Sequence, residues 1–586
     1  MTNRRSFIAG SAATIAAGSI LAADSCAPNV TLLQPATGAQ SAMGAQPAYE
    51  LIVHYGTHEM LGYTLHTRTY DGKLRGPTIE TRPGETLRIR VTNKLPPNPD
   101  ERPPAEALVP FYADPSMGAM AGGVAKTGSF AMRRSTHISQ MNNPHAFNTT
   151  NLHVHGIQTV PHLFFPVGTS DPTALMIAIE PGDSFLYSFP IPADHPSGLY
   201  WYHPHHHGAT DVQIAGGMAG LLVVRGPIDD VPEIKAAREI FLSVQSLLLN
   251  PSRSDPKRLQ YEFVAYKPPF PKGKGFNCPP DYMIVTVNEQ PVSFVNYTKP
   301  VKGFTSVEFT QHEPPVYRMQ PGEVVRLRIL NGTNFVYMPL ALPGMEVYVI
   351  ERDGINLPAP ELLDQDEAPR VVDAATIYAG TTVDMSPAAR AELLIRAKKP
   401  GRYALKSVAS RALLGMNFPD IDLAHFVVEG SPVSMSVPKS LPLPKREYPL
   451  IRENEIVRKR TLRFSEKPST EILTGTAFLL NGKLYDETRI DLEPVVGTAE
   501  AWTLTNTSSE VHAFHIHTNS FEVHAVNGSP IPVTLRDTIL LPPMRGGTPG
   551  SIDFRIRYKQ HRGKDVLHCH ILGHEDEGMM ENTLLS

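Results

Sequence analysis

Hydrophobic and polar residues alternate over short runs along most of this chain. In the run 86–92, leucine, isoleucine and valine take every second position between threonine and arginine. A period of two places the apolar side chains on one face of a strand, and Pro-Gly turns bound such runs at regular intervals. Long stretches with the period of a helix do not occur. The pattern therefore predicts an all-β protein built from sandwiches.

One of these runs is repeated. The segment 83–91, Pro-Gly-Glu-Thr-Leu-Arg-Ile-Arg-Val, recurs at 321–329 as Pro-Gly-Glu-Val-Val-Arg-Leu-Arg-Ile, and a fainter copy occupies 500–506. Repetition of a supersecondary unit at wide spacing indicates repeated domains. Three copies predict three consecutive β-sandwich domains.

Turn and proline residues mark the expected ends of these domains. A Gly-Pro turn at 226–230 ends the first domain, and the proline-rich segment 431–449 joins the second to the third. We expect domains at 48–226, 235–430 and 451–586.

The composition is that of an ordinary globular protein. Of 586 residues, 41% are hydrophobic and 19% are charged, and the net charge is −4. Charges of both signs are spread along the chain, which gives no electrostatic reason to expect nucleic acid or an anionic membrane as partner. Small molecules or metal ions are the expected partners of a protein that we expect to be a monomer.

The amino terminus has the features of an export signal. Asn3-Arg4-Arg5-Ser6-Phe7-Ile8 precedes a weakly hydrophobic stretch rich in alanine and glycine, which is typical of the twin-arginine route. Glycine, serine and threonine interrupt this stretch, so the alternative of a membrane span is disfavoured. We expect a signal at 1–27 and export to the periplasm. The cleavage site stays open, and Cys26 lacks the upstream leucine usual before a lipidated cysteine.

Cysteine is too rare for a disulfide framework, because the chain has only Cys26, Cys278 and Cys569. Cys569 stands between His568 and His570, with His574 and Met579 five and ten residues later. A thiolate, two imidazoles and a weak axial thioether are the ligands of a blue copper centre. Cys569, His574 and Met579, completed by His512 from an earlier strand, predict such a centre.

Side-chain parity on strands predicts a second metal site. Neighbouring residues of a strand point to opposite faces, so Cys569 faces away from His568 and His570. By the same rule His515 and His517 share a face that His512 does not. Two further His-x-His pairs lie early in the chain. The second site then collects eight histidines: His153, His155, His203, His205, His515, His517, His568 and His570.

Eight imidazoles are more than one copper ion binds, at roughly two to four each, so we expect about three ions in the second site. A single His-x-His pair is more often a satisfied pair in a core. Four pairs, one of which encloses a cysteine, favour ligands. With the blue centre the total is four copper ions, which matches the four electrons needed to reduce dioxygen to two waters.

These residues resemble the multicopper oxidases, a laccase-like family, over nearly all of the chain after the leader. The runs 201–208 and 217–223 are similar to those of the bacterial, copper-exporter-associated branch. The resemblance implies three consecutive cupredoxin-like Greek-key β-sandwich domains. It also implies a type 1 copper at His512, Cys569, His574 and Met579, a type 2 copper at His153 and His515, and a type 3 pair at His155, His203, His205, His517, His568 and His570.

All ligands fall in the first and third domains, so we interpret the middle domain as a spacer that lets the outer two meet. We expect electrons to enter at the type 1 copper through an edge of His512 or His574. Cys569 then passes them through its own backbone to His568 and His570.

Reduction of dioxygen also needs protons, which carboxylates can deliver. The resemblance implies a proton-relay acid at Glu575, directly after His574; the alternative is a solvated member of the acidic run 575–577. A second relay acid usually follows the first histidine pair, but the segment 160–166 has none. Asp171 is the substitute that we expect.

Two classes of function remain. One is an oxidase of phenols, aromatic amines or low-valent metals, with dioxygen as acceptor; the other is an exported copper-binding or copper-tolerance protein with little or no turnover. A copper nitrite reductase needs no eight-histidine site and is disfavoured. The methionine-rich insertion of cuprous oxidases is absent between 482 and 502. The long segment 96–148 carries several methionines, and we interpret it as a loop rich in glycine, proline and alanine rather than as a cuprous-ion site.

Overall fold

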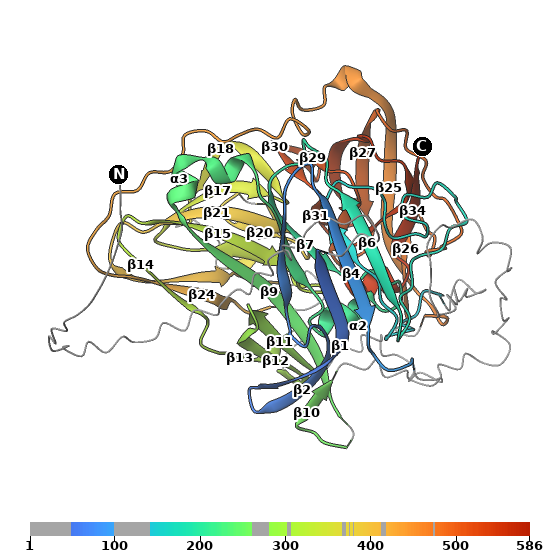
Figure 1. Ribbon diagram of the computed structural model, residues 1–586, viewed down its shortest axis with the longest axis horizontal. Coiled ribbons are helices and arrows are strands. Elements are labelled where there is room, and N and C mark those ends of the chain that lie inside the picture. The colour runs from blue at the N-terminus through green and yellow to red at the C-terminus, as the bar shows by residue number, and fades with distance from the viewer. Residues whose placement is uncertain are drawn as a thin grey trace, which may run out of the picture.

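The computed structural model shows three β-sandwiches (Figure 1). It describes residues 48–98, 141–252, 254–260, 281–301, 306–365, 371–373, 376–378, 380–411, 418–472 and 475–586. The expected export signal with Cys26, Cys278 and most of the segment 96–148 lie outside these residues. In Figure 1 the middle sandwich lies at the left, the third at the right, and the strands of the first between them. The prediction of an all-β fold is confirmed.

The first sandwich packs two layers of four strands each face to face. Val53 and Val91 on one sheet share a core with Val154 and Leu222 on the other. One sheet has the order β2 (Tyr63–Tyr70), β1 (Tyr49–Met60), β4 (Thr86–Asn93), β6 (Ser184–Pro190), and the other β3 (Gly76–Thr81), β8 (Gly220–Val224), β7 (Gly198–His203), β5 (His153–His155). The short helix α2 (Thr210–Ala215) lies between β7 and β8 in the chain.

The second sandwich is built in the same way around a core that includes Leu242, Leu327 and Phe426. Its larger sheet contains β18 (Ile355–Leu363), β17 (Glu346–Arg352), β21 (Arg390–Arg396), β15 (Val324–Asn331), β9 (Arg238–Pro251), β11 (Tyr282–Val287), β12 (Gln290–Val301) and β13 (Ser306–Gln311). The facing sheet contains β14 (Val316–Met319), β24 (Ile421–Val428), β22 (Gly401–Ser407), β16 (Met338–Ala341) and β20 (Val383–Met385). The remaining elements are η2 (Pro227–Asp230), α3 (Pro232–Ala236), and the pair β19 (Val371–Val372) and β23 (Ala409–Ser410).

The third sandwich encloses a core to which Phe464, Trp502 and Phe514 contribute. One sheet has the order β26 (Thr476–Leu480), β25 (Ile456–Pro468), β27 (Ala499–Asn506), β32 (Gly550–Arg557), β29 (Phe521–Val526), β30 (Ser529–Arg536). The other has the order β31 (Thr538–Leu541), β28 (His512–Ile516), β33 (Gly563–Cys569), β34 (Met580–Leu585). The single-turn helices η3 (Glu453–Glu455) and α4 (Leu572–Asp576) complete it.

The first and second sandwiches share one hydrogen-bonded sheet. The short strand β10 (Arg258–Gln260) pairs in parallel with β2 and antiparallel with the end of β9, which makes a sheet of 13 strands. An unpaired strand edge exposes donors and acceptors, and β10 covers the edge of β2. The two sandwiches are therefore joined by backbone as well as by side chains.

The internal repeat occupies the same structural position in each sandwich. The strands β4, β15 and β27 each pair in parallel with the first strand of their sandwich, which is β1, β9 and β25 respectively. Each repeat strand ends in a buried asparagine, namely Asn93, Asn331 and Asn506. The side-chain amide of each donates to backbone carbonyls of a following loop. The repeat is thus a repeat of hydrogen bonding as well as of hydrophobic pattern.

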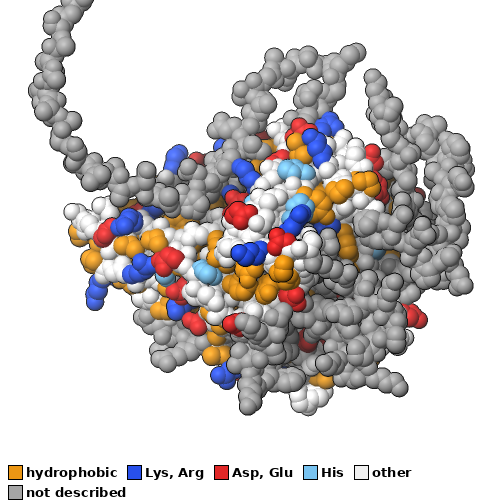
Figure 2. Space-filling view, turned by 90° about the horizontal axis from the view of Figure 1, so that it is seen from below, with side chains coloured by type: hydrophobic (Ala, Val, Ile, Leu, Met, Phe, Trp, Pro, Cys, Tyr) orange, Lys and Arg blue, Asp and Glu red, His pale blue; other side chains and the backbone are white. Residues whose placement is uncertain are grey.

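The described surface mixes charges of both signs. Figure 2 shows basic and acidic side chains interspersed with apolar ones on the described part of the lower face. Among the described residues, the structure has no helix with both the length and the apolar character that crossing a bilayer requires.

The repeat asparagines predict a stability effect. Asn331 Nδ2 donates to the carbonyls of Val336, Met385 and Ser386 at 2.8, 3.0 and 3.0 Å. Substitution Asn331→Ala leaves buried carbonyls without a donor, so we expect the free energy of unfolding to fall by about 3 kcal/mol in denaturant titrations. Asn356→Ala is the matched control, because this equally buried amide makes a single 3.3 Å bond, to Pro442 O. Equal losses in the two variants would contradict the role of the repeat.

Candidate metal centres

Strand pairing places the predicted ligands side by side. The register of β5 and β7 sets His153 opposite His203, and the register of β28 and β33 sets His515 opposite His568. Alternation along β33 then turns Cys569 away from His568. Cys569 lies in the apolar core of the third sandwich, whereas His568 faces the first sandwich.

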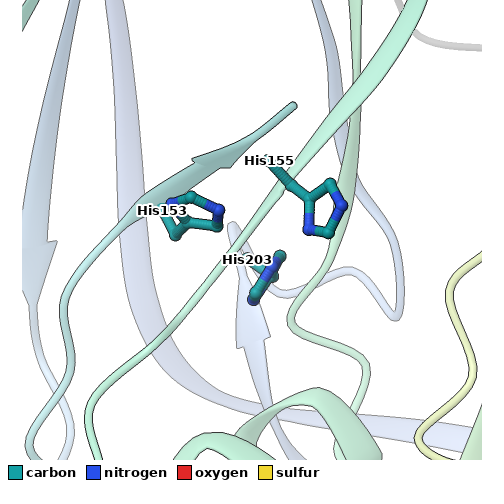
Figure 3. Close-up of side chains that lie close together, drawn as sticks. All are labelled: His153, His155 and His203. Carbon is teal, nitrogen blue, oxygen red and sulfur yellow. The ribbon is translucent and has the colours of Figure 1, made fainter. Parts of the chain in front are cut away.

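The structure brings all eight histidines together at the boundary of the first and third sandwiches. We call them the histidine cluster: His153, His155, His203, His205, His515, His517, His568 and His570. His153 stacks on His517 with ring centroids 3.9 Å apart, and His155 stacks on His515 at 3.8 Å. His205 Nε2 lies 3.1 Å from His568 Nε2. The two stacked pairs and the His205–His568 contact each join a residue of the first sandwich to a residue of the third. Figure 3 shows the three neighbouring rings His153, His155 and His203.

The ring nitrogens of the cluster fit metal ligands. His203 Nδ1 lies 2.8 Å from the carbonyl of Pro204, and His515 Nδ1 lies 2.8 Å from that of Asp537. The opposite nitrogens, His203 Nε2 and His515 Nε2, are buried without a hydrogen-bond partner, as is His153 Nε2. An imidazole that is held by one nitrogen and free at the other is the arrangement of a metal-binding histidine. Several sets of three have donor atoms within 4.8 Å of one another, including His153 with His515 and His517, and His205 with His517 and His568.

Burial keeps His153, His155 and His203 neutral. Loss of solvation lowers the pKa of His203 to about 3, and the pKa values of His153 and His155 fall well below the usual range for the same reason. Neighbouring histidines lower these pKa values further. A neutral imidazole has a lone pair for a metal, so these three residues need no change of protonation to bind one.

A second group, which we call the Cys569 site, lies inside the third sandwich. Cys569 Sγ is 3.8 Å from Nδ1 of His512 and 3.8 Å from Nδ1 of His574, and these two nitrogens are 3.2 Å apart. Met579 is fully buried, its amide donates to the carbonyl of His574, and its carbonyl accepts from the amide of Cys569. Cys569, His574 and Met579 are therefore tied together by backbone hydrogen bonds, and His512 reaches them from β28, which pairs with β33. A soft sulfur ligand with two imidazoles suits copper.

Glu575 lies directly against the histidine cluster. Its carboxylate oxygens are 2.9 Å from His568 Nδ1 and 3.4 Å from His205 Nδ1, and its side chain is fully buried. The next residue, Asp576, accepts hydrogen bonds from the amides of Gly208 and Asp211. These two bonds hold α4 to the first sandwich and so fix Glu575 between histidines of both ends. The alternative of a solvated acidic run is wrong, because all three of its residues are buried.

Asp171 has a different position from the one we expected. It is exposed, and its carboxylate accepts hydrogen bonds from the amide and the hydroxyl of Thr173, which lower its pKa. The structure does not bring Asp171 to the histidine cluster. The reason is local, because hydrogen bonds from Thr173 within the same turn hold the Asp171 carboxylate at the surface.

Three polar residues beside the cluster were missed by the sequence analysis. His162 Nε2 lies 3.0 Å from His153 Nδ1, and Asp565 Oδ1 lies 3.0 Å from His517 Nδ1. Burial raises the pKa of Asp565 to about 6. Asp537 approaches His155 and His515. His162 follows the first pair closely enough to have been considered, but no local pattern distinguishes the two aspartates from other strand residues.

Comparison with known proteins identifies related chains. Three family models, each described as multicopper oxidase, match residues 131–228, 268–413 and 458–584 and together span more than half of the chain. A multicopper oxidase of Staphylococcus haemolyticus is 22% identical over 524 residues, which cover 88% of this chain and 83% of that protein. A laccase of Bacillus subtilis is 22% identical over 563 residues, which cover 91% and 93%.

Solved structures share the fold. A multicopper oxidase from Campylobacter jejuni, described as a metallo-oxidase, superposes with a TM-score of 0.62 at 22% identity and covers 95% of this chain and 96% of its own. A likeness at this level of identity shows the arrangement of three cupredoxin-like sandwiches.

The buried thiol predicts a pH dependence of metal binding. Burial raises the pKa of Cys569 to about 12, so the thiol carries a proton at neutral pH and must release it to bind a metal. Higher pH therefore strengthens binding, by about tenfold per pH unit between about pH 7 and 9 for one released proton. Cobalt(II) is a suitable probe, because its thiolate absorption reports occupancy of this site. Absence of that absorption in Cys569→Ser is the control, and a pH-independent affinity would contradict the prediction.

Proposed function

The chain belongs to the multicopper oxidase family, which makes it a copper-dependent oxidase that uses dioxygen, and we propose that it holds four copper ions in two centres. The Cys569 site, with His512, Cys569, His574 and Met579, takes the type 1 copper. His153 and His515 take the type 2 copper, and the other six residues of the histidine cluster take the type 3 pair. The assignment of the cluster is supported by the unpartnered ring nitrogens of six of its histidines, and by burial, which lowers the pKa of His153, His155 and His203.

The observation that carries the proposal is the position of Cys569 between His568 and His570. One strand contributes the thiol to the core of the third sandwich and both imidazoles to the cluster, so a short covalent path joins the two centres. Copper ions, when bound, supply one-electron redox chemistry and a site for dioxygen. Cys569 and the backbone on either side of it then conduct electrons from a reducing substrate toward the cluster, where four are needed for two waters.

His574 is the better of the two candidate entry points for electrons. His574 keeps 8% of its surface exposed, whereas His512 is fully buried. Phe478 stacks on the His574 ring at 4.0 Å and covers one face, and Ser508 Oγ lies 2.8 Å from His512 Nε2. An electron can cross an imidazole edge without a shaped pocket. The substrate class therefore stays broad: phenols, aromatic amines or low-valent metal ions.

Glu575 is the proposed proton donor to the cluster. Its carboxyl group contacts His568 and His205 and can hold a proton at Oε2 or Oε1 in a dry site. A carboxyl group within 3.4 Å of two proposed ligands is near enough to the proposed reacting site to serve there as an acid. Export along the twin-arginine route to the periplasm, as a monomer, completes the proposal; the signal itself lies outside the described residues.

Oxygen uptake on copper-loaded protein tests the oxidase against a copper-binding protein without turnover. We expect uptake with a phenolic dye, with cuprous ion, or with both, measured side by side. In Cys569→Ser we expect the blue absorption and the uptake to disappear together, because the path between the centres is cut. Silence of the wild type with both reductants would favour the copper-binding alternative, and a variant that kept colour and turnover would overturn the assignment.

Two carboxylate variants test the proton path. We expect Glu575→Gln to lower oxygen turnover about 10²-fold or more with copper content unchanged, because the amide cannot release a proton to the cluster. Asp171→Asn should stay within about twofold of wild type, since an exposed residue bonded within its own turn cannot reach the reacting site. Steady-state oxygen consumption at matched copper content measures both. A large loss of oxygen turnover in Asp171→Asn alone would instead support Asp171 as the relay acid.

A further inference from the structure

Arg390, at the start of β21 in the middle sandwich, forms a buried ion pair with the third sandwich. Its Nη1 and Nη2 donate to the two carboxylate oxygens of Asp537 at 2.8 and 2.5 Å, and its residue is fully buried. It also donates to the carbonyls of Leu199, in the first sandwich, and Ala388. A bidentate pair of this kind fixes both the position and the plane of a carboxylate.

Asp537 in turn contacts two members of the histidine cluster. Its Oδ1 lies 3.4 Å from His155 Nε2, and its carbonyl lies 2.8 Å from His515 Nδ1. The hydroxyl of Thr538 lies 3.2 Å from His155 Nε2 and 3.1 Å from His515 Nδ1. His155 and His515 are the stacked pair that joins the first and third sandwiches. Their opposite nitrogens, His155 Nδ1 and His515 Nε2, are left without partners.

We infer that Arg390 is a positioning residue of the histidine cluster, acting through Asp537 on His155 and His515. The inference rests on the proposed function, because it concerns the copper ions that this cluster would hold. Arg390 keeps the carboxylate and the adjacent backbone of Asp537 in place, and these select which nitrogen of each ring faces the metals. The first sandwich supplies His155, the third supplies His515 and Asp537, and the middle one supplies the cation that holds them. The middle sandwich is therefore more than a spacer.

Gly156 shows how closely the ion pair packs against the ligand strand. It follows His155 with a positive φ of 82°, and a Cβ there would lie 2.4 Å from Arg390 Nη2 and 2.5 Å from Asp537 Oδ2. The ion pair fills the space beside His155 that a larger residue would occupy. A movement of Arg390 would therefore free the backbone at His155 as well as the side chain of Asp537.

A purely structural role for Arg390 is the competing explanation, and the chain offers a matched control for it. Arg328, on β15 of the same sheet, is equally buried and pairs with Glu239, Glu392 and Asp229 at 2.5, 2.5 and 2.8 Å. These acids lie in the middle sandwich and its entry linker. Loss of Arg328 removes a buried cation from the same sheet. The three acids that accept its hydrogen bonds do not belong to the histidine cluster.

The test compares Arg390→Met with Arg328→Met in copper-loaded full-length protein. Copper per chain is measured by metal analysis, and electron paramagnetic resonance separates the type 1 signal from the type 2 signal. In Arg390→Met we expect the cluster to lose affinity for copper about 10- to 100-fold, while the blue type 1 signal is retained. In Arg328→Met we expect both signals in the wild-type ratio. Wild-type cluster occupancy in Arg390→Met would overturn the inference.

A double variant covers the case in which Arg390→Met fails to fold. Arg390→Met with Asp537→Leu removes both charges of the ion pair, so neither is left buried without the other. The buried Asp353, which lies 3.7 Å from Arg390 Nη1, keeps Arg536 at 4.0 Å. We expect this protein to fold and bind type 1 copper but to show the same loss at the cluster. A full cluster in the double variant would reduce Arg390 to a structural role and overturn the inference. A wild-type protein that binds no cluster copper would instead contradict the proposed function.

Discussion

The histidine cluster depends on one contact, the packing of the first sandwich against the third. Each sandwich alone would present four imidazoles on a strand surface, where water would satisfy them. At the boundary all eight are buried, and rings from the two sandwiches stack, as His153 does on His517. Buried nitrogens without partners are costly, and a metal ion removes that cost. The contact between sandwiches and the binding of metal thus stabilise each other.

The middle sandwich makes that contact possible by continuous connections on both sides. It shares a hydrogen-bonded sheet with the first sandwich through β10, and it reaches the third through the ion pair of Arg390 with Asp537. Both connections are specific in direction, since one is a backbone register and the other a bidentate pair. The two ends of the chain therefore meet in one relative orientation rather than in a loose association.

The surroundings of the cluster depart from the pattern that the family resemblance implied. Where a relay acid was expected in the first sandwich, the histidine His162 contacts His153, and an aspartate of β33, Asp565, contacts His517. Glu575 keeps the expected place next to His568. Ligand positions are set by local spacing, whereas the polar groups around them can come from any strand that passes nearby.

By itself, the sequence determined the sandwich architecture, the repeat and the two sets of candidate ligands, because strand alternation converts spacing along the chain into faces of a sheet. Alternation along a strand places Cys569 on one face and His568 and His570 on the other. Only the tertiary structure decided which distant groups touch them. Arg390 and Asp537 are far apart in the chain, and Asp171 lies near a ligand pair in sequence yet turns to solvent. Contacts between sandwiches arise from packing of whole domains, and no periodicity along the chain encodes them.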